Sequence, residues 1–288
     1  MMNRALVLSE RIFDGTAELR DNKNTHRYVS SFLVLTFIVC LFLGQMIKWG
    51  WIPASHLSSE FSNPFFAIEF SFTLLLLLEI LSLIFVLPGS VAKAVGKQFE
   101  LLSLIFIRSG IKEFSHIKNT FETKPLSEEL YAMFAYAFGA LLIFVIMGFT
   151  YRVQKHIKLT NIEDDQTQFV RSKKLLAIIL LAIFMSVGIY DIKNLIHTGT
   201  YLKSFNVFYN FLIFSDIIIV LIALRYTLNY YRIFRYSAFV LATILIRISL
   251  SAGMYYNVLI GVISAMFILL LTLAYNYFLK ELKPTLDG

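Results

Sequence analysis

The sequence predicts an all-α, polytopic integral membrane protein with about eight transmembrane helices. Hydrophobic residues make up 58% of the 288 residues, and the mean hydropathy is +0.70. A soluble domain is about 45–50% apolar. The apolar residues also gather in runs of about twenty, which is the length that a helix needs to cross a bilayer. The connections between the runs are short, so little of the chain remains for a domain outside the membrane.

Residues 1–27 precede the first apolar run and are expected to form a cytoplasmic N-terminal segment. Ile12 and Leu19 interleave with bases such as Arg11, a pattern typical of a short amphipathic helix on the inner membrane surface. A solvated tail is the alternative. The acids Glu10 and Asp14, together with the length of the apolar run that follows, argue against a cleaved signal peptide.

The first half of the membrane region is expected at residues 28–151 and contains four apolar segments. Three of them are clear spans, at 28–49, 65–87 and 130–151. The segment 95–114 is ambiguous because it carries four charges within its length: Lys97, Glu100, Arg108 and Lys112. A six-span version, in which this segment lies on the inner surface, stays open.

A cytoplasmic loop at 152–174 is expected to separate the first half from a second four-helix half at 175–279, with a cytoplasmic tail at 280–288. The clear spans of the second half are expected at 175–192, 207–225 and 254–279, and the segment 236–252 is ambiguous because it is short and contains Arg247. Tyrosines that crowd the boundary near residues 226–236 are interpreted as interfacial anchors. Four glycines within the expected spans are interpreted as sites of close helix packing: Gly139, Gly148, Gly188 and Gly261.

The distribution of basic residues predicts the orientation. Lys and Arg concentrate in alternate loops, as cytoplasmic loops do, which places both termini in the cytoplasm of a plasma or inner membrane. This bias also explains the net charge of +7. The bases never gather in one stripe, so no nucleic-acid partner is expected. The single cysteine, Cys40, lies inside the first apolar run and allows no intrachain disulfide.

The two halves resemble each other around their charges. Glu79 precedes Arg108 by 29 positions, and Asp216 precedes Arg247 by 31. Each arginine also ends a segment that starts with Phe and contains a small hydroxyl residue. Two parallel four-helix repeats, related by an axis along the membrane normal, are one explanation. Chance similarity between apolar segments is the other.

Five charges in the apolar runs are the candidate site: Glu69, Glu79, Arg108, Asp216 and Arg247. A charge at the bilayer centre costs about 2.5–3.5 kcal/mol on insertion scales, so such residues are usually paired or face a wet interior. Counting the helix rise from the outer end matches Glu69 best to Arg108 in depth. The five charges predict a polar track for an ion, a proton or an anionic solute. The alternative is structural ion pairing that fixes how the helices pack.

The sequence carries no recognisable enzyme motif and no cluster of metal ligands. We therefore expect no catalytic activity, cofactor or metal. The function predicted is a channel or transporter for an ion or small charged solute. The alternative is a membrane scaffold or signalling subunit that docks a partner protein through its spans and its inner loop. The lipid bilayer is an expected partner in either case, and a homo-oligomer stays open.

Overall fold

The computed structural model describes residues 2–49, 66–114, 128–154, 163–198, 205–226 and 230–282. Within these ranges the regular structure is entirely helical, which confirms the all-α prediction. The helices in chain order are α1 (Met2–Asp21), α2 (Lys23–Lys48), α3 (Phe66–Val86), α4 (Val91–Phe114), α5 (Glu128–Val153), α6 (Glu163–Thr198), α7 (Phe205–Tyr226), α8 (Tyr230–Ser251) and α9 (Tyr256–Leu282).

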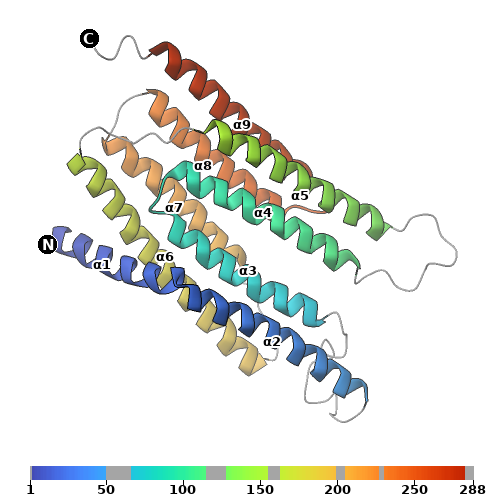
Figure 1. Cartoon of the computed structure of the whole chain (residues 1–288). Coiled ribbons are helices and arrows are strands. Elements are labelled where there is room, and N and C mark those ends of the chain that lie inside the picture. The colour runs from blue at the N-terminus through green and yellow to red at the C-terminus, as the bar shows by residue number, and fades with distance from the viewer. Residues whose placement is uncertain are drawn as a thin grey trace.

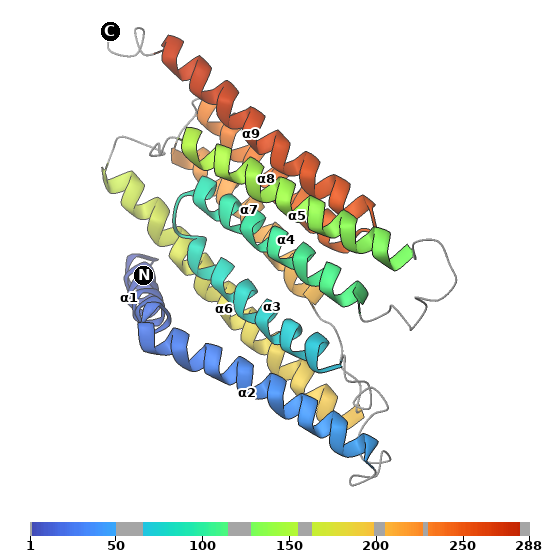
Figure 2. The same cartoon turned by 45° about the vertical axis from the view of Figure 1, so that its right-hand side comes forward.

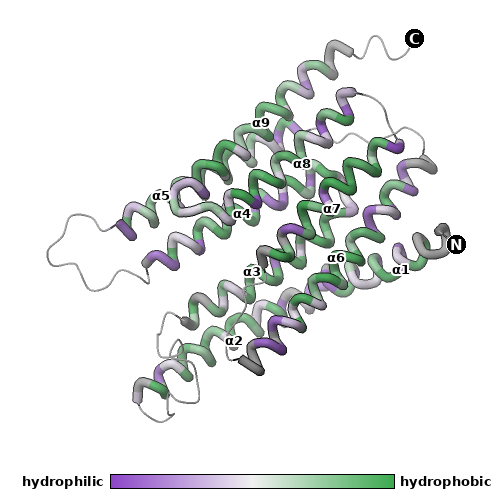
Figure 3. The backbone as a smooth tube through the Cα atoms, turned by 180° about the vertical axis from the view of Figure 1, so that it is seen from behind, coloured by the Kyte–Doolittle hydropathy of each residue, from purple (hydrophilic) through white to green (hydrophobic). Residues whose placement is uncertain are grey.

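Five helices of the described residues are long and apolar enough to cross a membrane. Figure 3 shows hydrophobic residues along most of their length, with hydrophilic residues towards the ends. The five segments are Lys23–Ile47 in α2, Glu128–Val153 in α5, Gln166–Asp191 in α6, Tyr230–Ser251 in α8 and Tyr256–Phe278 in α9. They fit a membrane-embedded protein, as the composition predicts. The shorter segment Phe70–Val86 of α3 is also an apolar helix.

The chain bends between α1 and α2. Asn22 is the N-cap of α2, where its side-chain oxygen accepts a hydrogen bond from the backbone N–H of Asn24 at 3.0 Å. A cap of this kind satisfies one of the unpaired N–H groups at a helix start. Figure 2 shows α1 almost end-on while α2 runs across the view. The expected N-terminal segment is therefore a separate helix that does not continue the direction of α2.

Helix α6 is longer than the expected span. Helix α6 already begins at Glu163, so the second part of the cytoplasmic loop expected at 152–174 is helical. Phe169 on this extension is 1% exposed and contacts the rings of Tyr226 and Tyr236, with centroids 5.9 and 6.4 Å away. Tertiary packing therefore accounts for these turns of helix. The two tyrosines therefore also pack against another helix, which their interpretation as interfacial anchors did not include.

A tight turn reverses the chain between α3 and α4. The backbone N–H of Gly89 donates to the Val86 carbonyl at 3.0 Å, and a Cβ on Gly89 would lie 3.1 Å from the same oxygen. The N–H of Ala94 then donates to the Ser90 carbonyl at 2.9 Å and starts α4. The segment expected at 95–114 thus begins one turn earlier and packs directly on α3.

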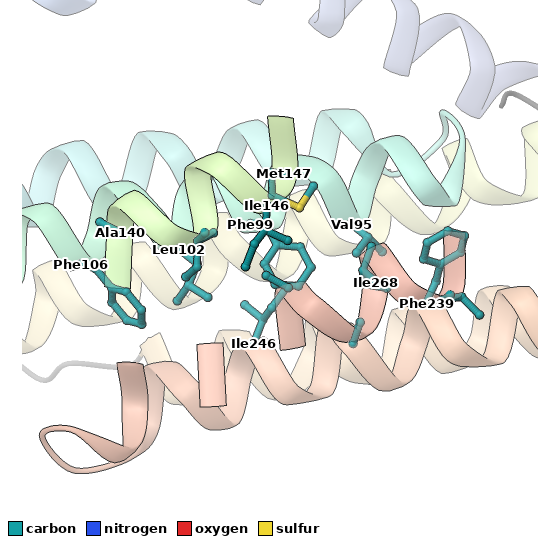
Figure 4. Packing of buried hydrophobic residues seen from close by; sticks show 14 of the residues in the cluster. Val95, Phe99, Leu102, Phe106, Ala140, Ile146, Met147, Phe239, Ile246 and Ile268 are labelled. Atoms are coloured by element: carbon teal, nitrogen blue, oxygen red, sulfur yellow. The ribbon is translucent and has the colours of Figure 1, made fainter. Parts of the chain in front are cut away.

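Helices α2 to α9 lie side by side along a common direction (Figure 1). Their buried apolar residues form two clusters. One joins α4, α5, α8 and α9 through side chains such as Phe99, Ile146, Ile246 and Ile268 (Figure 4). The other joins α1, α3, α6 and α7 through Phe13, Ile80, Leu180 and Phe208, among others. Each cluster therefore combines helices from both halves of the sequence.

The glycines divide into two groups. A Cβ on Gly139 would strike the Val258 side chain, and one on Gly261 would lie 3.1 Å from Leu102 and Phe106, so both positions permit close helix approach. Gly148 and Gly188 face open space, with nothing within 4 Å of an added Cβ. The packing interpretation is confirmed for the first two glycines and wrong for the other two.

Candidate functional site

The five candidate charges lie on four helices. Glu69 and Glu79 belong to α3, Arg108 to α4, Asp216 to α7 and Arg247 to α8. The side chain of Glu69 lies outside the described residues, so its expected match with Arg108 stays a prediction. The other four charges form two groups at the contacts between consecutive helices, one at α3–α4 and one at α7–α8.

Glu79 and Arg108 form a two-pronged ion pair. Arg108 Nη1 donates to Glu79 Oε2 at 2.6 Å, and Arg108 Nη2 donates to Glu79 Oε1. Parallel N–H to carboxylate bonds of this type are the strongest ion-pair geometry in proteins. The two side chains are 14% and 17% exposed. The sequence did not predict Glu79 as the partner, because counting rise along straight helices omits helix tilt and the reach of an arginine.

The second group is more deeply buried. Asp216 is 8% exposed and Arg247 is 4% exposed. Arg247 acts on the Asp216 carboxylate through its charge, and Thr243 and Gln98 are its polar neighbours. Arg247 Nη2 donates to Gln98 Oε1 at 3.4 Å. These four residues, Asp216, Arg247, Thr243 and Gln98, are called the Asp216 cluster below.

One carboxylate oxygen in the Asp216 cluster is an acceptor without a donor in the described residues. Asp216 Oδ2 is buried and makes no hydrogen bond within the part of the chain that the structure describes. Buried acceptors without a donor are rare and costly in native proteins. The Glu79 carboxylate differs, because both of its oxygens accept bonds from Arg108.

Gln98 and Thr243 are the site residues that sequence reasoning missed. Thr243 was visible as the small hydroxyl residue in the segment that ends at Arg247, but no property of that segment says that it faces Asp216. Gln98 comes from α4, which packs against α8 although more than a hundred residues separate them in sequence. The sequence feature that could have indicated Gln98 is a neutral polar residue next to the charged Lys97. A search for charged residues alone therefore finds Asp216 and Arg247 but not the two neutral members of the cluster.

Glu100, at the edge of α4, forms a separate polar contact. Lys97 Nζ donates to Glu100 Oε2 at 2.7 Å, and both side chains are more than 40% exposed. The hydroxyl of Tyr151 donates to the other carboxylate oxygen at 2.8 Å. This position fits a solvated charge near the end of a span.

Ion pairs also attach α1 to the first turns of α6. Glu10 Oε2 accepts from Arg171 Nε at 2.9 Å, and Glu10 Oε1 accepts from Lys174 Nζ at 3.2 Å. Lys174 also donates to Asp14 at 2.8 Å. The hydrogen bond from Lys174, followed by the smaller effect of Arg171, holds the pKa of Glu10 below its usual value although burial opposes this shift. The N-terminal helix is thus anchored at one end of the bundle.

The contacts of Lys173 extend this attachment to the α3–α4 turn. Its ammonium group donates to the Gly89 carbonyl and lies 4.8 Å from the centre of the Phe169 ring. Within the described residues, no three side chains of His, Cys, Asp or Glu gather where they could hold a metal ion.

No family model, curated protein sequence or solved structure matches the chain.

Proposed function

We propose that this protein is a channel or transporter that moves an ion or a small charged solute across a membrane at the Asp216 cluster. The observation that carries the proposal is a nearly fully buried acid and arginine where α4, α7 and α8 meet. Ionisable residues are costly inside a membrane helix and are typically retained where an ion, proton or charged solute passes. Under this proposal the Glu79–Arg108 pair is structural and fixes α3 against α4.

The proposal includes eight crossings, formed by α2 to α9. Helices α3, α4 and α7 lie alongside the five long apolar helices (Figure 1, Figure 2). Three of the charges that make α4 less apolar have partners within the protein: Arg108 binds Glu79, and Lys97 binds Glu100. An even number of crossings puts both chain ends on one side of the membrane. The excess of Lys and Arg in alternate loops supports the cytoplasmic side.

The order of helix contacts supports two parallel repeats, α2–α5 and α6–α9. Within each set, successive helices pack on each other: α2 on α3, α3 on α4 and α4 on α5, then α6 on α7, α7 on α8 and α8 on α9. Between the sets, α4 packs on α8 and α5 on α9, which are equivalent positions. The acid of each set lies on its second helix and the arginine on its third. An axis between α4 and α8 would relate the two acid–arginine groups.

Ion flux into liposomes tests the proposed function. The purified protein would be reconstituted, and flux of K⁺, Na⁺, H⁺ and Cl⁻ recorded with fluorescent indicators. Arg247→Gln should abolish or alter flux per inserted molecule, because it removes the charge that faces Asp216. The matched control is Lys97→Gln, a cation at the exposed edge of α4, which should leave flux unchanged. Absence of flux for every ion, with the native protein folded and inserted, would reject the proposal.

A second candidate function is a scaffold that binds a membrane partner, and α2 is the observation that favours it. Of the five long apolar helices, α2 is the least buried in the structure. A groove of about 400 Å³ between α2 and α3 is lined by Tyr28, Val29, Phe32, Leu33, Leu74, Leu77 and Leu78. Lipid would cover this surface in a monomer. Stoichiometric co-purification of a partner, lost on Phe32→Ala and combined with absence of ion flux, would favour the scaffold.

A further inference from the structure

One face of α2 carries two cations followed by an apolar hollow. Lys23 and Arg27 lie one turn apart on this helix, and both side chains are exposed. A hollow of about 410 Å³ comes next along the helix and is lined by Ser30, Ser31, Val34, Leu35 and Ile38. Side chains four and seven residues apart share a face of a helix, so Arg27 is in line with Ser31 and Val34. The two cations and the five lining residues are called the α2 stripe below.

The α2 stripe lies at the edge of the bundle. Among the described residues, side chains of α2 alone line the hollow, and the groove that α2 shares with α3 is lined by other residues of α2. Leu35 is 60% exposed. Figures 1 and 2 show α2 as an outer helix in both views. In a protein embedded in a membrane, a surface of this kind is covered by lipid or by another chain.

The cations of the α2 stripe lie where the apolar part of the helix begins. Helix α2 contains no Asp or Glu, and after Arg27 its next charged residue is Lys48 at the far end. Tyr28, which follows Arg27, is 75% exposed, and exposed tyrosines are typical of the boundary between lipid and water. Long basic side chains near a helix end extend towards the headgroups. Lys23 and Arg27 are therefore at the level of the lipid phosphates.

Helix α1 supports this level. Its inner side packs into the bundle through Phe13, which is 7% exposed. Leu8, Ile12 and Leu19 are exposed instead, at spacings of four and seven residues that put them on one face of the helix. Such an apolar face on a helix with exposed bases is typical of a helix that lies in the headgroup region. The bend between α1 and α2 then falls at the membrane surface, next to Lys23.

The charge balance selects the class of lipid. Residues 20–27 contain three permanent cations, Arg20, Lys23 and Arg27, and one acid, Asp21. Neither Lys23 nor Arg27 forms an ion pair with another described residue, whereas Arg20 donates to Ser82 at 3.2 Å. Basic residues at the membrane surface attract anionic lipids. A zwitterionic lipid carries its own cation beside the phosphate, so it gains less from two further cations.

We propose that the α2 stripe binds one anionic phospholipid from the leaflet at the N-terminal end of α2. The phosphate lies between Lys23 and Arg27, and one acyl chain lies in the hollow from Ser30 to Ile38. A lipid fits both parts of the stripe at once, because it joins an anionic group to an apolar chain. The inference concerns the surface of the bundle and does not depend on the proposed transport function.

Photolabelling in detergent micelles tests the proposal. The purified native protein would be mixed with a phosphatidylglycerol that carries a diazirine in its acyl chain, irradiated, and mapped by peptide mass spectrometry. We expect the label to concentrate on residues 30–38 of α2. Unlabelled phosphatidylglycerol should compete with the probe for these residues much better than an equal amount of phosphatidylcholine.

Variants of the cations test the phosphate site. Lys23→Gln and Arg27→Gln should each lower the apparent affinity for the probe at residues 30–38 about fivefold, the effect expected of one basic residue at a membrane surface. The matched control is Lys93→Gln/Lys97→Gln, which removes two cations with the same spacing from the start of α4, a helix that packs on α3, α5 and α8. This control should leave the label on α2 unchanged.

A change in the hollow tests the chain site without altering charge. Ser31 is exposed and lines the hollow, so Ser31→Phe should fill the space and lower the label on residues 30–38 while the protein stays folded. This variant keeps the proposal testable even if loss of the two cations changes how the protein inserts.

Three outcomes would overturn the proposal. Label spread evenly over the exposed helices, or equal competition by phosphatidylcholine, would show that ordinary lipid contact covers the α2 stripe. A protein that co-purifies in equal amount and shields residues 30–38 would make the stripe a protein interface. None of these results changes the expected ion flux, so transport stands or fails by its own test.

Discussion

The Glu79–Arg108 pair and the Asp216 cluster place the same two kinds of charge between neighbouring helices, but they satisfy the carboxylate differently. Both oxygens of Glu79 accept bonds from one guanidinium group. Asp216 instead lies near a threonine, a glutamine and Arg247, and its Oδ2 has no hydrogen-bond donor in the described structure. Each oxygen of the Glu79 carboxylate therefore has a donor from a permanent cation, whereas one oxygen of Asp216 has none in the described residues.

The comparison shows that a buried charge does not by itself indicate a functional site. Asp216 and Arg247 are 8% and 4% exposed, so they are more deeply buried than Glu79 and Arg108, but one Asp216 oxygen has no donor in the described residues. The difference comes from α4, which contributes Arg108 to one group and Gln98 to the other. In the second group a neutral amide stands beside the acid. A neutral group can keep its contacts when the charge of its neighbour changes.

The largest expected effect comes from separating the first pair. Arg108→Leu leaves the Glu79 carboxylate without its cation, and removal of one partner from a buried pair costs about 3–5 kcal/mol. We expect a large fall in folded yield and in the thermal unfolding midpoint in detergent, measured by circular dichroism. Glu79→Leu/Arg108→Leu should recover most of the loss, because no uncompensated charge remains. If the double variant is as unstable as the single one, the pair is not structural in the way proposed.

A smaller effect is expected from Gln98→Leu in the second group. The substitution removes one neutral hydrogen-bonding side chain and leaves its partners buried, which costs about 1–3 kcal/mol. The unfolding midpoint should fall less than in Arg108→Leu, while flux in liposomes should fall more than the loss of folded protein explains. Ser103→Ala is a matched control on the same helix, because that hydroxyl bonds to the backbone carbonyl of Glu100 at 2.7 Å. Unchanged flux and unchanged stability in Gln98→Leu would show that Gln98 does not link Asp216 to Arg247.

The smallest effect is expected at the ion pairs that attach α1 to α6. Surface pairs contribute about 1 kcal/mol or less, and salt screens them. We expect that about 1 M salt increases hydrogen exchange in α1 without changing exchange in α3 and α4, whose pair is largely buried. Exchange in α1 that does not respond to salt would show that Phe13, buried among α3, α6 and α7, holds the helix alone.

The pH dependence of the α1 attachment has a definite sign. The pKa of Glu10 is lowered in the folded protein from a usual value of 4.5. Its contribution to stability is therefore complete above about pH 4.5 and is lost as the pH falls through the lower, folded-state pKa. Exchange in α1 should rise on acidification. Glu10→Gln should show raised exchange already at neutral pH and a smaller rise on acidification, because the Lys174–Asp14 pair remains.

The sequence by itself determined the helical class, the position of each apolar segment and the charges that are costly in lipid. These follow from local quantities: run length, hydropathy and the energetic penalty of a charge among apolar residues. Helix ends were predicted less well, since α6 continues to Glu163 through the packing of Phe169 against tyrosines from α7 and α8. No local pattern contains that contact.

The tertiary structure alone decided which charges meet and how each is satisfied. Glu79 became the partner of Arg108 because α3 packs on α4 and the long arginine side chain reaches it. Gln98 reached Arg247 because α4 packs against α8, helices that are far apart in the sequence. Hydrophobic residues can pack against many helix surfaces at similar energy, so hydropathy positions a helix in the membrane without selecting its neighbours. The neighbours come from the fit of side chains such as Phe99 and Ile246 in the shared core, and that fit exists only in the folded bundle.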